Sequence, residues 1–339
     1  MSEYSRLPKS ITIIDGTLRE GLQNEEILVP TETKLFILES LIDAGFRIFE
    51  VGSFSPPAAM PQFRDSEEIT KRMPRKSNIF YKINTFNMKL VERAIEAKKG
   101  GYGPDIINTQ FATTEEFSQY FFRTTVANRW KFIEEALKVA HDAGLMFQLS
   151  IINTWYCPFK GEMPMEVSLE YTDKLIKMGC DIVRACDPTG FVTPPKAYEY
   201  FSRVLDKHPD PNNHTYHQHD HRCFGLSNYL AAMQAGCTRF DTSLGGTGGP
   251  TATIVGGIHP KGAVEYVHRP YKTGLVCTED FVTMCDAMGI ETGIDLDKVF
   301  RLGKWIERIL ERKLWSFCIN HSRVPKGSQI IKGLEKEIG

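Results

Sequence analysis

The chain has 339 residues, of which 42% are hydrophobic and 24% charged, so it can build a sizeable core and is not disordered. The 41 Lys and Arg residues nearly balance the 42 Asp and Glu residues, for a net charge of -1, which argues against a nucleic-acid-binding protein that works by bulk charge. No apolar run approaches the roughly 20 residues of a membrane helix, and the first ten residues lack the apolar core of a signal peptide.

Along most of the chain, a short β-branched or aromatic run is followed by an amphipathic helical stretch, and this pattern repeats. The predicted strands are 11–14, 47–51, 78–83, 105–108, 146–152, 181–185, 215–219 and 238–241. The predicted helices are 33–44, 89–98, 125–143, 164–178, 195–207 and 226–235. Eight β-then-α units in about 250 residues predict an α/β fold of the (β/α)8 barrel type.

The competing layout is a doubly wound open sheet, which normally carries a glycine-rich fingerprint after its first strand. Here that turn reads DGTLREGLQNE, so the TIM barrel is favoured. We predict a TIM-barrel catalytic domain over residues 8–290 and a short C-terminal helical extension over residues 291–339. The extension has apolar residues spaced for one helix face, which predicts a packing or oligomer surface. They are Leu302, Trp305, Ile306, Ile309 and Leu310.

Polar side chains follow every predicted strand, where the chemistry of such barrels lies. They are Asp15, Arg19 and Glu20; Glu50 and Ser53; Asn84; Gln110; Asn153; Asp187; His217 and His219; and Asp241 and Ser243. One polar strand end would face solvent by default, but polar groups at all eight ends are better explained by a shared site. The residues predicted to bind the substrate there are Gln23, Ser53, Asn84, Gln110 and Asn153.

The most informative local pattern is His217-Gln218-His219. Residues i and i+2 of a strand point the same way, so both imidazoles can converge on one point. The alternative is that one histidine is a buried, hydrogen-bonded side chain. With Glu20 available from the first strand end, we predict that Glu20, His217 and His219 bind a divalent metal ion. Mg²⁺ or Mn²⁺ is the expected ion, with Zn²⁺ or Co²⁺ as alternatives.

Three further features belong to the same region of the predicted barrel. Arg19 is predicted to face the pocket rather than to form a surface ion pair. The glycine-rich segment 245–250 is interpreted as a mobile flap, with phosphate binding by its backbone as the alternative. Lys82 alternates with Asn84 and can point inward, where pairing with a carboxylate is favoured over a role as Schiff-base nucleophile.

Together these residues resemble a known family. The segment DGTLREGLQNE at 15–25 is similar to the opening motif of the metal-dependent barrel enzymes called DRE-TIM metallolyases. Within that group the chain most resembles the 3-hydroxy-3-methylglutaryl-CoA (HMG-CoA) lyases, in order from about residue 10 to 325. The other matching motifs are EVGSFSPP at 50–57, MPQ at 60–62, CPFKG at 157–161, DPTG at 187–190, HQHD at 217–220, TED at 278–280 and TGIDL at 292–296.

The resemblance implies roles for individual residues. It places the metal on the same three side chains as the strand pattern does. It implies that Arg19 polarises the thioester or carboxylate oxygen of the substrate and stabilises the enolate that cleavage produces. Glu50 would orient the metal-bound groups, and Asp187 would contact the substrate hydroxyl.

The chain departs from the lyase pattern in its metal residues and in its glycine-rich loop. Glu20 stands where the lyases have Asp, although homocitrate synthases of the same group have Glu, so metal binding is expected to survive. Pro250 aligns with the catalytic cysteine of the lyases' loop, and Leu275 lies near their asparagine ligand. This chain therefore lacks the loop thiol and that amide.

The segment 250–275 is also longer than its counterpart in the lyases, and its basic residues suggest a cationic lid for an anionic substrate. It contains His259 and His268, whose ordinary pKa near 6.5 suits proton transfer at neutral pH. We predict that His268 is the catalytic one of the two, because Arg269 beside it could bind the substrate's anion. The alternative is that both histidines are exposed lid residues.

These observations predict a divalent-metal-dependent carbon–carbon lyase acting on a 3-hydroxy acid or its CoA thioester. The main alternative is a citramalate- or homocitrate-type synthase, which joins acetyl-CoA to a 2-oxo acid and also lacks the loop cysteine. The REGLQNE, SFSPP and CPFKG segments are lyase-like. A pyruvate carboxyltransferase is less expected without a biotin-carrier segment, and a non-catalytic metabolite-binding barrel is the remaining alternative.

The expected partner is a small anionic hydroxy acid or an acyl-CoA, with no nucleic acid and no membrane. The eight cysteines include no CxxC pair, which is typical of reduced thiols inside the cell. We therefore expect a cytoplasmic protein, and we expect it to form a homodimer or a higher homo-oligomer.

Overall fold

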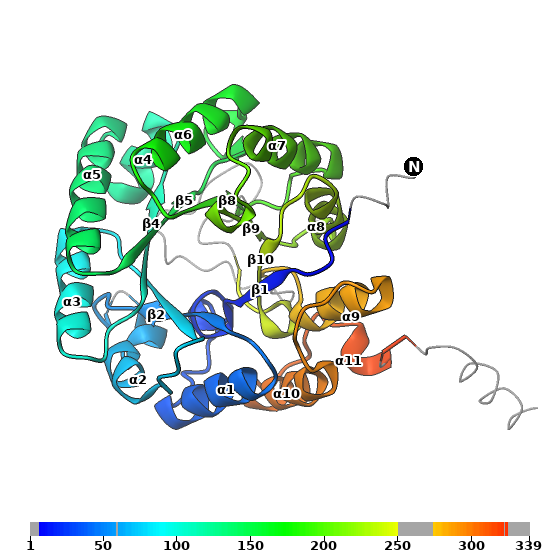
Figure 1. Ribbon diagram of the computed structural model, residues 1–339. Coiled ribbons are helices and arrows are strands. Elements are labelled where there is room, and N and C mark those ends of the chain that lie inside the picture. The colour runs from blue at the N-terminus through cyan, green and yellow to red at the C-terminus, as the bar shows by residue number, and fades with distance from the viewer. Residues whose placement is uncertain (1–6, 59, 250–273, 322, 325–339) are drawn as a thin grey trace, which may run out of the picture.

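The computed structural model describes residues 7–58, 60–249, 274–321 and 323–324. Eight parallel strands close into a barrel in the order β1-β10-β9-β8-β5-β4-β3-β2. They are β1 (Thr12–Asp15), β2 (Ile48–Ser53), β3 (Phe80–Asn84), β4 (Ile106–Phe111), β5 (Met146–Ile151), β8 (Ile182–Asp187), β9 (His214–Gln218) and β10 (Arg239–Thr242). Each predicted strand overlaps one of these, so the predicted (β/α)8 barrel is confirmed (Figure 1).

Helices surround the barrel on its outside (Figure 1). They are α1 (Thr31–Asp43), α2 (Ser66–Arg72), α3 (Met88–Lys99), α4 (Glu115–Phe122), α5 (Val126–Asp142), α6 (Met165–Lys177), α7 (Pro194–Lys207), α8 (Gly225–Gln234), α9 (Thr278–Met288), α10 (Leu296–Ile309) and α11 (Cys318–His321). All six predicted helices are present. The sequence analysis did not predict α2, α4 or α9; α2 and α4 have only 7 and 8 residues, too few for a clear periodic pattern.

Shorter elements lie in the loops after the strands. They are the π-helical turn η2 (Thr17–Gly21), the 3-10 turns η3 (Pro61–Phe63), η4 (Pro211–Asn213) and η5 (Leu244–Gly246), and the antiparallel pair β6 (Tyr156–Cys157) and β7 (Gly161–Glu162). Two of these turns, η2 and η5, follow β1 and β10, which are neighbours in the barrel. They therefore bring residues 17–21 and 244–246 to the same part of the barrel rim.

The barrel interior is polar, whereas the apolar core lies between the strands and the helices. Phe49 and Tyr81 point outward from neighbouring strands, with ring centroids 5.9 Å apart, and belong to the largest buried apolar cluster. Inward-pointing polar side chains are bonded to one another. Lys82 Nζ donates to Gln148 Oε1 at 3.1 Å, and Arg184 Nε donates to Ser150 Oγ at 2.7 Å. A buried polar network thus lies inside the barrel, below the strand ends.

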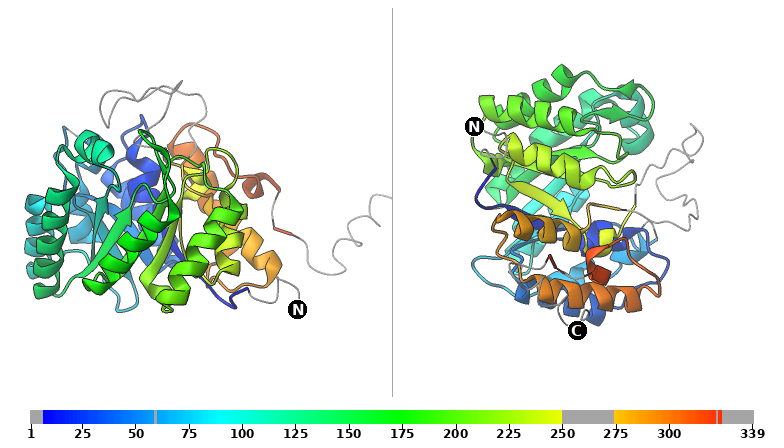
Figure 2. Two further views of the ribbon diagram at one scale, coloured as in Figure 1. Left: turned by 90° about the horizontal axis from the view of Figure 1, so that it is seen from above. Right: turned by 90° about the vertical axis from the view of Figure 1, so that its right-hand side faces the viewer.

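The C-terminal helices pack against one side of the barrel, as the right-hand view of Figure 2 shows. Leu302, Ile306 and Leu310 are buried in the largest apolar cluster, so this part of the predicted helix face packs on the barrel. Trp305 does not share that burial, because it is 50% exposed and contacts Phe36 of α1. Among the described residues, no helix is both long and apolar enough to cross a membrane. All eight cysteines lie in the described part of the chain, and each is free.

Candidate metal centre

The turn after β1 holds Arg19 and Glu20 in the interior. Asp15, at the end of β1, accepts hydrogen bonds from the Thr17 amide at 3.1 Å and from Thr17 Oγ1 at 2.7 Å. These two bonds fix the start of η2, in which every residue is buried. Burial raises the pKa of Asp15 to about 7 despite both hydrogen bonds. The first strand therefore ends in a fixed turn that presents an arginine and a carboxylate side by side.

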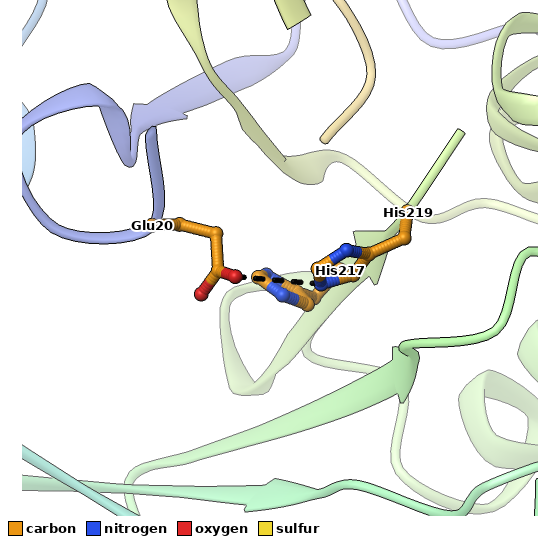
Figure 3. A group of neighbouring side chains, drawn as sticks. All are labelled: Glu20, His217 and His219. Atoms are coloured by element: carbon orange, nitrogen blue, oxygen red, sulfur yellow. Dashed lines mark ion pairs between the residues drawn. The ribbon is translucent and has the colours of Figure 1, made fainter. Parts of the chain in front are cut away.

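The two histidines at the end of β9 lie on the same side of the strand and approach Glu20 (Figure 3). One ligand atom from each of Glu20, His217 and His219 lies within 4.8 Å of the other two. Nε2 of His219 is 3.7 Å from Oε1 of Glu20. All three side chains are buried. The structure therefore brings the three predicted metal residues together at one point.

The chemistry of this group fits a divalent cation. Burial lowers the pKa of His217 and His219, which favours the neutral imidazole that binds metals. Nδ1 of His217 lies 2.8 Å from Oδ2 of Asp241. When Nδ1 carries the proton and donates it to this carboxylate, Nε2 has a free lone pair that can bind a metal ion. Nδ1 of His219 has no hydrogen-bond partner within the described part of the chain. Two nitrogen donors and one carboxylate oxygen suit several divalent ions and do not single out one of them.

A buried network of charges surrounds the metal residues. Arg184 Nη1 lies 2.8 Å from Asp241 Oδ2 and 3.1 Å from Glu50 Oε2. Arg19 is hydrogen-bonded to Glu20, and its Nε lies 3.8 Å from Glu50 Oε1. Burial alone would raise the pKa of Glu50, but the nearby cations outweigh it and lower this pKa to about 2. Glu50 is therefore a charged link between the two arginines.

Lys82 belongs to the same network. Its Nζ lies 3.8 Å from Asp241 Oδ1 and donates to Gln148, so the favoured carboxylate pairing of this lysine is confirmed. Burial lowers the pKa of Lys82 to about 8, while the negative charge of Asp241 opposes that shift.

A cavity opens directly beside the metal residues at the C-terminal ends of the strands. It is lined by Arg19, Glu20, Gln110, Phe117, Phe121, Ile152, Arg184, Cys186, Pro188, His217 and His219. The predicted metal residues, Arg19 and Gln110 therefore share one pocket. Glu50 contacts both arginines of that pocket from below.

Two of the predicted site residues point away from this pocket. On β8, Arg184 and Cys186 line the pocket, so the alternation of a strand directs Asp187 to the other side. Its carboxylate accepts hydrogen bonds from the amides of Thr189, Gly190 and Val192 and from Gln218 Nε2. Likewise Ile152 lines the pocket, whereas the side chain of Asn153 donates to the Tyr156 carbonyl at 3.3 Å. Asp187 thus holds the loop after β8 in this structure.

The other predicted substrate-binding residues are buried close to the strand ends without lining the pocket. Ser53 Oγ donates to the Asn84 carbonyl at 3.0 Å, and the Asn84 side chain accepts a hydrogen bond from Asn108. Gln23 is buried just beyond η2. The predicted catalytic residue His268 lies outside the described residues, as do His259 and Pro250, so their roles stay predictions.

The flap interpretation of the glycine-rich segment is wrong for residues 245–249, which are all buried. The Gly245 amide donates to Glu279 Oε2 at 2.7 Å, and Gly248 has a φ of +114°. A Cβ atom on Gly248 would lie 2.8 Å from the backbone oxygen of Glu20. Gly248 is therefore needed because its backbone packs closely against the metal-bearing turn.

Sequence reasoning missed several residues of the site. Arg184 organises the network with Asp241, and its signal was a charge inside the buried strand β8, whereas Asp241 had been predicted only as a polar residue at its strand end. Phe117 and Phe121 come from α4, which was not predicted. His221 continues the alternation of His217 and His219, and its ring stacks on that of His219 at 5.4 Å and 12°.

The comparisons with known proteins agree with this geometry. A family model described as HMGL-like matches residues 10–306. The chain belongs to this family. The resemblance to the HMG-CoA lyases that the motifs indicated is thereby confirmed.

Individual relatives are similar over nearly their whole length. The mitochondrial hydroxymethylglutaryl-CoA lyase of Bos taurus is 30% identical over 312 residues, which cover 92% of this chain and 89% of that protein. The Bacillus subtilis lyase YngG is 26% identical over 91% of this chain and 95% of its own. The structure of an HMG-CoA lyase from Acinetobacter baumannii in complex with coenzyme A and 3-methylmalate is 29% identical, with a TM-score of 0.81, over 96% of this chain and 100% of that one.

The contact between Asp241 and His217 yields a first prediction. Asp241→Asn should weaken Mn²⁺ binding by about 10- to 100-fold, because the amide no longer fixes the tautomer and orientation of a metal-binding histidine. Isothermal titration calorimetry measures the affinity. Asp43→Asn, an exposed carboxylate on α1 that pairs with Lys298, is the matched control and should bind Mn²⁺ as the wild type does. Equal affinities in all three proteins would contradict the role of Asp241.

The lowered pKa of Glu50 yields a second prediction. The folded protein keeps Glu50 charged down to about pH 2, whereas the unfolded chain protonates it near its ordinary value of 4.5. The stability that Glu50 contributes is therefore present above pH 4.5 and is lost as the pH falls toward 2, by a few kcal/mol at about 1.4 kcal/mol per pKa unit. Urea unfolding between pH 6 and pH 3 should show that the free energy of unfolding falls less steeply with decreasing pH in Glu50→Gln than in the wild type. An unchanged slope would argue against a charged Glu50.

Proposed function

We propose that this protein is a divalent-metal-dependent carbon–carbon lyase that cleaves a 3-hydroxy acid or its CoA thioester. The convergence of Glu20, His217 and His219 beside Arg19, in one buried pocket, carries this proposal. The HMGL-like family supports it, since the relatives named above are HMG-CoA lyases and one related structure contains coenzyme A. A small anionic hydroxy acid or an acyl-CoA as substrate, a cytoplasmic location and a homo-oligomeric state belong to the same proposal.

The metal residues and their neighbours have separate tasks in this reaction. Glu20, His217 and His219 would hold the cation, and Asp241 orients His217. A divalent ion bound there would act as a Lewis acid that lowers the pKa of the substrate's hydroxyl group. The bond between the hydroxyl-bearing carbon and the neighbouring α-carbon breaks, the hydroxyl becomes a carbonyl, and the α-carbon takes up a proton through an enolate.

Arg19 is placed to stabilise that enolate. Its guanidinium lines the pocket, is almost fully buried and is held by Glu20 and Glu50. A fixed planar donor in a water-poor site favours developing negative charge without reorganising during the reaction. His268 is proposed as the group that transfers the proton, since Pro250 has none to exchange.

A third prediction tests the metal centre. Glu20→Gln, His217→Ala and His219→Ala should each lower the bound Mn²⁺, measured by elemental analysis after dialysis, and should abolish cleavage while the circular dichroism stays unchanged. His141→Ala replaces an exposed histidine of α5 that pairs with Asp181, so it should keep both metal and activity. Activity is screened on 3-hydroxy acyl-CoAs and free hydroxy acids by following acetyl-CoA, free CoA and 2-oxo acids. Full activity in excess chelator would overturn the proposal, and condensation of acetyl-CoA with a 2-oxo acid would favour the synthase.

A fourth prediction separates catalysis from binding at Arg19. Arg19→Lys should lower kcat by about 10²-fold or more, because a point charge replaces a planar pair of donors. Metal content should stay at the wild-type level, which serves as the control. If only KM rises, Arg19 binds the substrate without stabilising the transition state.

A further inference from the structure

The pocket beside the metal residues has a lining of two chemical kinds. Arg19, Glu20, Gln110, Arg184 and the two histidines form its polar part. The rest is largely hydrocarbon and forms what we call the apolar wall. This wall consists of Phe117 and Phe121 from α4, Ile152 after β5 and Pro188 after β8.

The apolar wall is held firmly in place. The rings of Phe117 and Phe121 are stacked, with centroids 5.6 Å apart and planes 12° from parallel. Phe117 is 2% exposed and packs in one buried cluster with Ile152. Its amide donates to Thr114 Oγ1, which caps the start of α4. The first turn of the helix is thus fixed to the barrel.

Arg129 fixes the other end of α4. Its guanidinium lies 4.0 Å from the ring centroid of Phe122 and donates to the carbonyls of Gln110 at 2.7 Å and Phe86 at 2.8 Å. The last turn of α4 is therefore tied to the ends of β3 and β4. Both ends of the helix are anchored, so the two stacked rings form a rigid surface next to the metal residues.

We infer that the apolar wall receives a hydrocarbon substituent of the substrate's hydroxyl-bearing carbon, and that this substituent is larger than methyl. The inference rests on the proposed function, which places that carbon at the metal residues. Within the described lining, the only cations are Arg19 and Arg184, and both already pair with carboxylates. A second carboxylate against the wall would lose its hydration without gaining an unpaired cation among these lining residues.

The size of the wall argues for more than one carbon atom. Two phenyl rings, an isoleucine and a proline offer far more apolar surface than one methyl group can cover. Each further buried methylene contributes about 0.8 kcal/mol, which is roughly fourfold in affinity. Phe121 sets the selectivity, because it is partly exposed at the edge of the wall, whereas Phe117 is locked inside.

The test measures binding apart from catalysis. Isothermal titration calorimetry in the presence of Mn²⁺ measures the affinity for 3-alkylglutaryl-CoA compounds. These compounds lack the hydroxyl group, so they bind without being cleaved. Their alkyl group is methyl, ethyl or propyl, and a carboxymethyl compound is the charged member. In the wild type, propyl should bind about 10-fold or more tightly than methyl, at roughly fourfold per methylene. The carboxymethyl compound should bind more weakly than the propyl compound.

Substitutions of Phe121 on α4 test whether this residue causes the preference for the longer alkyl group. Phe121→Ala should reduce the propyl-to-methyl ratio below about threefold, while Phe121→Leu should keep most of it, since an apolar side chain remains. Phe80→Ala is the matched control, because Phe80 is an exposed phenylalanine at the start of β3 and does not line the pocket at the strand ends. It should keep the wild-type ratio even if it lowers stability.

The two proposals fail separately. Equal wild-type affinity for methyl and propyl, a preference for carboxymethyl, or the same loss of selectivity in Phe80→Ala would overturn the inference. If the corresponding 3-hydroxy compounds are still cleaved, the proposed function survives that result. If the binding ratios are as expected and no 3-hydroxy compound is cleaved, the lyase proposal fails and the assignment of the apolar wall stands.

Discussion

The contact on which the site depends is the one that Asp241 makes with His217 and Arg184. One carboxylate oxygen lies 2.8 Å from Nδ1 of His217 and 2.8 Å from Nη1 of Arg184. A buried carboxylate is costly unless cations and hydrogen bonds compensate it. Arg184 supplies that compensation, reaches Glu50 as well, and so links the histidine side of the pocket to Arg19. The metal residues and the proposed enolate-stabilising arginine are thereby held by one network.

This network explains why the barrel interior is polar. In many barrels of this fold, branched apolar side chains fill the interior in layers. Here Lys82, Asn108 and Arg184 occupy that space, and Asn108 Oδ1 accepts from both Gln148 and Ser150. A densely bonded polar network favours one arrangement, because a displaced member would leave buried groups without their partners. The barrel interior thus buries fewer apolar side chains, and in return its charged side chains are held in fixed directions.

The sequence predicted the barrel and the metal residues because both rest on periodicity. Strand alternation places His217 and His219 on one side, and each predicted strand contains β-branched or aromatic residues. The same alternation, applied to β8, would have turned Asp187 away from the pocket, since Arg184 and Cys186 face it. The apolar wall could not be predicted in this way, because α4 has only 8 residues, too few for the i, i+4 spacing of Phe117 and Phe121 to identify a helix. The glycine-rich segment suggested motion, but the close packing of Gly245, Gly246 and Gly248 depends on Leu314, Leu275 and Glu20, which are distant in sequence.

The described residues that flank segment 250–273 contact the backbone of the metal residues. Gly248 packs on the Glu20 backbone, and on the other side the Asp220 amide donates to the Gly274 carbonyl at 2.8 Å while Leu275 pairs with His219. The Gly274 amide also donates to the Gly246 carbonyl at 2.8 Å, so these ends are held together. Closing a loop whose ends are fixed costs only about 0.6 kcal/mol more for each doubling of its length. The sequence between these anchors can therefore differ in length from that of the lyases, as the sequence analysis predicts, while the arrangement of Glu20 and His219 stays the same.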